Sequence, residues 1–298
     1  MVNESSAKGF NYFFGLVNLV VVFCIVWLLW YIFMNPDAVF KLYTPMYGFA
    51  LVVVFISSII LMTNVIGYPA IFERQMANPN PVKKGLILTL VAFILMVLIN
   101  YMLFWGFIGK FGIAYFSPDS IVAGGGLDEP FMARENASIA ILYYFTAFLW
   151  IALFWNLGFG QWPWQQNNRG TQIASKIFAI FFIVTLIYVV LFHSHVCYLF
   201  YPAQSKAGVA PWWEAMAGTG SAFFGLGIVL CTLVWIIFSD LLWEGHPWKA
   251  LEKDGSANFG KGFITFIVTL TFGFLLLYLM LNIFDYVWDE AFLGGQYT

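Results

Sequence analysis

The segment around His193 carries the residue types best suited to hold a metal ion. His193, His195 and Cys197 fall within five consecutive residues at the end of a long apolar run. In a helix, His193 and Cys197 share a face, whereas His193 and His195 point about 200° apart. Together with Asp285 or a second chain, His193 and Cys197 would form a zinc or copper site, or His193 would ligate a haem or pigment. One alternative is a substrate or proton role for His193. The other is that His193 forms hydrogen bonds to a neighbouring helix while His195 lies at the membrane interface.

Other polar side chains interrupt the apolar runs. Those toward the outer side are predicted to converge and bind a substrate: Asn100, His193, Asn282 and Asp285. Polar groups in a bilayer tend to face the bundle interior, which supports this prediction. As an alternative, the asparagines join helices, at about 1 kcal/mol each, and Asp285 belongs to a solvated acidic helix end. A second set lies toward the inner side: Asn64, Asn156 and Asp240.

Motifs of soluble-type catalysis are absent from the sequence. It contains no Walker motif, nucleophile elbow, H-E-x-x-H or C-x-x-C-H pattern. The apolar runs hold no carboxylate for proton or sodium coupling. The remaining link to enzymatic function is that the chain is a non-catalytic subunit of a membrane oxidoreductase. No cofactor is strongly implied.

Composition places the chain in a membrane. Of its 298 residues, 62% are hydrophobic and 9% are charged, against about 25% charged residues in soluble domains. So few charges cannot solvate the surface of a globule, and a net charge of −2 provides no basic patch for nucleic acid. The partner is therefore the lipid bilayer, with other membrane subunits as a second expectation.

Seven apolar runs are long enough to cross a bilayer, for which about 20 residues are needed. Because lipid offers no hydrogen bonds to the backbone, the runs should be helices. The expected fold is one all-α bundle of seven transmembrane helices over residues 1–298. The predicted spans are 13–34, 46–66, 86–108, 137–157, 177–200, 215–238 and 262–284.

Basic residues set the expected orientation. The N-terminus and the loops on its side hold nine Lys and Arg residues, and the opposite loops hold four. Because cytoplasmic loops are enriched in these residues, the N-terminus should be cytoplasmic and the C-terminus outside. The expected location is a prokaryotic cytoplasmic membrane. Segment 109–136 then becomes an external loop, with an eighth span or a re-entrant piece as the rival interpretation.

Two of the predicted spans end alike. Asn156 precedes Pro163-Trp164 by seven residues, and Asp240 precedes Pro247-Trp248 by the same interval. Asn64 ends the second span in a similar but shorter pattern. The chain is thus interpreted as one leading helix plus three helical hairpins, 46–108, 137–200 and 215–284. Shared interface chemistry is the alternative, because Pro stops helices and Trp favours the headgroups.

Two functions remain in competition on the sequence. The first is a transporter or facilitator for a small neutral or weakly polar solute, with a polar pocket near the outer leaflet. It is favoured by seven spans, a hairpin pattern and Asn and His side chains without buried charge. The second is a membrane subunit of a redox or energy-converting complex that holds a quinone, metal or pigment, favoured by the 21% aromatic content. A structural subunit without a site is a third interpretation.

Overall fold

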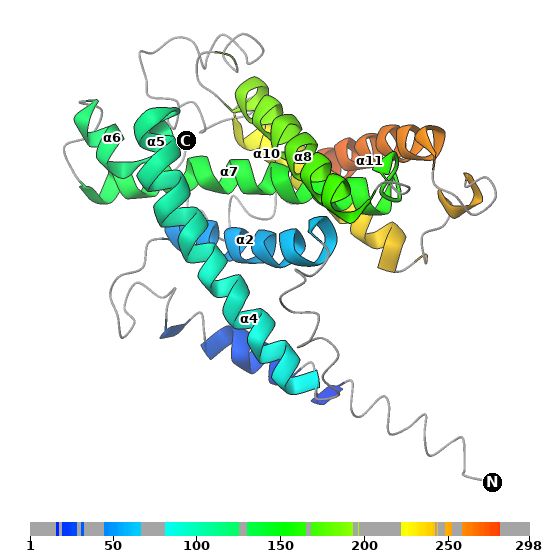
Figure 1. Cartoon of the computed structure of the whole chain (residues 1–298), viewed down its shortest axis with the longest axis horizontal. Coiled ribbons are helices and arrows are strands. Elements are labelled where there is room, and N and C mark those ends of the chain that lie inside the picture. Colours follow the sequence, from blue (N-terminus) through cyan, green and yellow to red (C-terminus); the bar gives the residue numbers. More distant parts are fainter. Residues whose placement is uncertain are drawn as a thin grey trace.

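The computed structural model is helical, and no strand occurs in the part of the chain that it describes (Figure 1). The described residues are 16–17, 20–28, 31–32, 45–66, 81–124, 130–164, 168–192, 196, 222–241, 243, 248–251 and 258–280. In chain order the elements are α2 (Pro45–Ile60), η2 (Leu61–Val65), α4 (Pro81–Val97), η4 (Leu98–Ile108), α5 (Gly109–Phe111), η5 (Ala114–Phe116), α6 (Pro118–Ala123), α7 (Pro130–Leu157), α8 (Arg169–Leu191), α10 (Ala222–Leu241), η9 (Trp248–Leu251) and α11 (Phe259–Leu279).

Five helices are long and apolar enough to cross a membrane, so the chain is an all-α integral membrane protein. They are Tyr47–Val65, Val82–Phe111, Met132–Leu157, Arg169–Leu191 and Phe259–Leu279. The predicted spans 13–34 and 215–238 are described only in part. Residues 20–28 are helical in the former, and the latter contains the shorter apolar helix Gly225–Ser239.

Local chemistry explains where the helices begin. The helices α2, α4, α6 and α7 start at proline, whose fixed φ and missing N–H suit the first helical position. Helices α8 and α11 begin with an asparagine cap. The Asn168 side chain accepts a hydrogen bond from Thr171 N at 2.9 Å, and Asn258 accepts one from Lys261 N at 2.8 Å.

Helix α7 is the centre of the bundle. It packs against α2, α10, α8 and α6, and it runs through the middle of the molecule in Figure 1. In its most apolar window 83% of the residues are buried, against 17% in the helix Val82–Phe111. A helix that is apolar on all sides suits this position, while the outer helices expose apolar side chains to lipid.

Consecutive helices pack as pairs. Helix α2 lies against α4, α7 against α8, and α10 against α11, which are the pairs within the three expected hairpins. Helices α4, α8 and α11, the second members of these pairs, each have their main partner within their own pair. The duplication of a hairpin sequence remains a prediction.

Several helices start earlier than the predicted spans. Helix α7 begins seven residues before 137, and the segment from 109 onward forms α5, η5 and α6 rather than an extended loop. None of these three is long enough to cross a bilayer. Helices α8 and α11 take in Lys176 and Lys261, which are buried. The span predictions stopped near charged residues, but backbone hydrogen bonding continues past a charge that lies near the membrane surface.

Candidate functional site

A cavity of about 620 Å³ opens where η4, α6 and the start of α7 meet. The η4 helix contributes an aromatic wall, α5 and α6 contribute a polar and charged wall, and α7 contributes an arginine. The lining residues are Tyr101, Trp105, Gly106, Lys110, Ser117, Pro118, Asp119, Val122, Ala123 and Arg134. The site therefore combines aromatic surface with both signs of charge at one end of the bundle.

The aromatic wall belongs to a π-helical stretch. Through Leu98–Ile108 the backbone follows the i→i+5 pattern, and Gly109 N–H still bonds to Phe104 O beyond it. A β-carbon on Gly106 would lie 3.1 Å from Tyr101 O, five residues earlier, so the small residue fits this tighter approach. Single-turn π-bulges are frequent at functional sites, and this stretch is longer.

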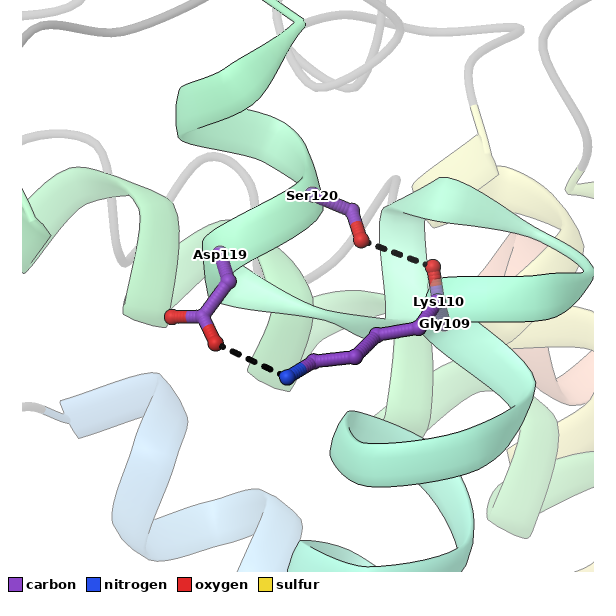
Figure 2. A network of polar contacts seen from close by, with 4 residues as sticks. All are labelled: Gly109, Lys110, Asp119 and Ser120. Carbon is purple, nitrogen blue, oxygen red and sulfur yellow. Dashed lines mark hydrogen bonds and ion pairs between the residues drawn. The ribbon is translucent and has the colours of Figure 1, made fainter.

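The polar wall is held by a close turn. Ser120 Oγ donates to Gly109 O at 2.9 Å, and Lys110 Nζ lies 3.5 Å from Asp119 Oδ2 (Figure 2). A β-carbon on Gly109 would collide with Ser117, whose backbone N would be only 2.5 Å away. Only glycine permits this approach, which brings α6 back over the end of η4.

The charges of the cavity differ in how they are matched. Lys110 is paired with Asp119, and both side chains are well exposed. Arg134 is also exposed, and its guanidinium has no hydrogen bond or ion pair with any described residue. It lines the cavity together with Tyr101. The lining thus carries one positive charge without a described counter-charge.

Packed aromatic rings connect the elements that carry the cavity lining. Phe104 and Phe116, the neighbours of lining residues Trp105 and Ser117, have ring centroids 5.0 Å apart. Phe116 in turn lies 4.9 Å from Tyr188 of α8, and Phe104 lies 5.1 Å from Tyr144 of α7. These four rings are buried. They join η4, η5, α7 and α8.

A second polar cluster lies at the other end of α7. Lys176 Nζ donates to Gln161 Oε1 at 2.7 Å, and Gln161 Nε2 donates to Asn156 Oδ1 at 3.1 Å. Gln161 reaches both because its backbone is left-handed, with φ 66°. Along α7 the rise from Arg134 to Asn156, 22 residues, is about 33 Å. This separation is close to a hydrocarbon thickness of about 30 Å.

The predicted site residues have different outcomes. Asn100 is buried in η4 and precedes the cavity residue Tyr101 in the chain, and its Nδ2 atom has no hydrogen-bond partner among the described residues. The residues His193, His195, Cys197, Asn282 and Asp285 lie outside the described residues. Of the residues predicted on the inner side, Asn156 belongs to the polar cluster of Lys176 and Gln161. Asn64 lies in the π-helical η2. Asp240 lies in α10, and its side chain is outside the described part.

Sequence reasoning missed the charged lining of the cavity. Lys110, Asp119 and Arg134 were counted only as outer-loop charges, because segment 109–136 was expected to be a loop. Pro118 and Pro130, each at a helix start, are the signal that could have revealed helices there. Gln161 and Lys176 were missed because their contact depends on a turn conformation that spacing does not disclose.

Among the described side chains, no group of three or more His, Cys, Asp or Glu residues is placed to hold a metal ion. The His193 and Cys197 metal site thus remains a prediction about residues outside this part. Comparison with protein-family models, with curated proteins and with solved structures finds no match to this chain.

Proposed function

We propose that the protein is an integral membrane transporter or facilitator for a small solute, which enters through the cavity at the end of η4. The observation that carries this proposal is the cavity itself, because it is concave, partly aromatic and polar, and lies at one end of the spanning helices. The uncharged interior of the predicted spans favours a solute that is neutral or weakly polar in the form that crosses.

Passage through the bundle requires the packed aromatic rings to separate. Phe116 packs against both Phe104 and Tyr188, and the burial of these three rings supports a closed barrier on the proposed route. The π-helical backbone of η4 supports a role in such a change, because a shift between π and α hydrogen bonding would rotate Tyr101 and Trp105. Solute binding in the cavity would then precede opening.

The membrane arrangement is part of the proposal. We infer seven spans, a cytoplasmic N-terminus and an external C-terminus in a prokaryotic cytoplasmic membrane, which would place the cavity on the outside. The excess of basic residues on the N-terminal side supports this orientation. The alternative of a redox subunit depends on His193 and Cys197, and no described feature favours it over transport.

Flux into liposomes tests the proposal. Purified protein is reconstituted, and stopped-flow light scattering follows the entry of glycerol, urea and dimethyl sulfone. We expect at least one solute to enter severalfold faster than in protein-free liposomes. Ala123→Trp, which places a large ring in the cavity lining, should abolish that excess. The matched control is Phe178→Trp on the exposed face of α8, which should leave it unchanged.

Two results would contradict the proposal. One is a rate equal to that of protein-free liposomes for every solute. The other is a rate that Ala123→Trp leaves unaltered, because the cavity would then not lie on the route.

A further inference from the structure

The Arg134 side chain is the feature of the cavity that the proposed function does not use. It is exposed within a concave lining and makes no described ion pair, whereas the other cation, Lys110, faces Asp119. The ionised lining groups therefore carry a net charge of +1: Lys110 and Arg134 against Asp119. An uncompensated cation in a cleft attracts anions.

The chemistry around Arg134 selects the kind of anion. A guanidinium presents paired N–H groups that match a carboxylate or phosphate better than a spherical ion. The hydroxyl of Tyr101, which lines the same cavity as Arg134, can donate a further hydrogen bond to an oxyanion. The rings of Tyr101 and Trp105, with centroids 4.9 Å apart, offer apolar surface to the remainder of the molecule.

We propose that the cavity binds an organic oxyanion, with Arg134 as its charged ligand and Tyr101 and Trp105 against its apolar part. Two sources share this chemistry, a free weak acid and the phosphate of a lipid headgroup. The free-acid source rests on the proposed function. A weak acid would bind at the mouth as its anion, take a proton from solvent to cross the uncharged interior as the neutral acid, and release that proton on the far side.

A pair of probes that differ in charge tests the binding. The full chain in phosphatidylcholine nanodiscs is titrated at pH 7 by calorimetry with benzoate and with its neutral analogue benzamide. We expect benzoate to bind more tightly, and added salt to reduce the difference. Arg134→Gln should remove the preference, and Arg134→Lys should retain part of it because the charge remains. Lys249→Gln, which removes an exposed charge from η9, is the matched control and should change nothing.

A second arm identifies the lipid source. Lipids that copurify with the wild type and with Arg134→Gln are measured by mass spectrometry. An anionic lipid held by the wild type and lost from the variant supports the oxyanion site and assigns it to a headgroup. The inference is overturned if benzoate shows no preference over benzamide and no lipid depends on Arg134.

The outcomes separate this inference from the proposed function. Benzoate binding that depends on Arg134, without any solute flux, would remove the transporter proposal and leave the oxyanion site. Solute flux that Ala123→Trp blocks, without binding of benzoate or of an anionic lipid, would leave the transporter proposal and remove the oxyanion site. Size-exclusion profiles of Arg134→Gln and Arg134→Lys establish that a loss of binding is not a loss of fold.

Discussion

Two amides in this bundle, the half-buried Gln161 and the buried Asn100, show how differently a polar side chain can be accommodated. Gln161 is satisfied on both sides, because it accepts from Lys176 and donates to Asn156. Asn100 is almost completely buried, and its Nδ2 atom has no partner in the part of the chain that the structure describes. A buried donor without an acceptor costs about 1–3 kcal/mol. Asn100 therefore fits poorly with helix joining and better with a role in which its amide acquires a partner.

Asn100→Leu separates these two roles. We expect the melting temperature of the variant in detergent to be unchanged or higher, because an unsatisfied amide is replaced by an apolar group of similar size. Gln161→Leu is the comparison, and it should lower the melting temperature by leaving the buried Lys176 ammonium without its acceptor. A clear drop for Asn100→Leu would instead establish this amide as a stabilising contact between helices.

At the level of the helices, close approach depends on small residues. Helix α11 meets α10 where Gly273 faces Thr232, and a β-carbon at Gly273 would overlap the Thr232 hydroxyl. The backbone N of Thr232 would lie only 2.9 Å from it, so a side-chain rotation cannot relieve the contact. One residue earlier in α11, Phe272 O accepts a hydrogen bond from Trp235 Nε1 at 3.0 Å. This glycine therefore sets the separation of the α10–α11 pair.

Gly273→Ala should force the two helices apart. Overpacking of this kind costs about 1–3 kcal/mol, which should appear as a lower thermal or denaturant midpoint. Gly85→Ala is the matched control, because a β-carbon there meets nothing within 4 Å and alanine favours the helix. Equal midpoints for Gly273→Ala and the wild type would show that the α10–α11 contact is looser than described.

The whole molecule is polarised along α7. Arg134 and the Lys110–Asp119 pair mark one end, and the Lys176–Gln161–Asn156 cluster marks the other. In the proposed orientation the oxyanion site faces outside and the lysine cluster faces the cytoplasm. The central helix is buried by protein between these ends, so only the outer helices present apolar surface to lipid.

Labelling of single cysteines tests this polarity. Cys24, Cys197 and Cys231 are first replaced by serine, and Lys110→Cys or Lys249→Cys is then introduced. A membrane-impermeant maleimide should label residue 110 in intact cells and residue 249 only in inverted vesicles. Labelling of residue 249 in intact cells and of 110 only in inverted vesicles would invert the orientation, and labelling of both from one side would contradict the span arrangement between them.

The sequence by itself determined that the chain is a helical membrane protein. Charge content and run length are sufficient for this, because hydrocarbon admits few charges and forces backbone groups into helices. The five long apolar helices confirm the class. The pairs α2–α4, α7–α8 and α10–α11 are consecutive in the chain, and consecutive elements are usually adjacent in space.

Only the tertiary structure decided what the polar residues do. Spacing could place Asn100 in a span, but its lack of a partner depends on which helices surround it. The sequence interpretation placed Arg134 and Lys110 in a loop. In the structure they line a cavity, because α6 lies back over the end of η4, and Gly109 permits this approach for steric reasons. The cavity forms where three segments, η4, α6 and α7, meet. Sequence periodicity could not predict it, because periodicity describes the faces of only one segment at a time.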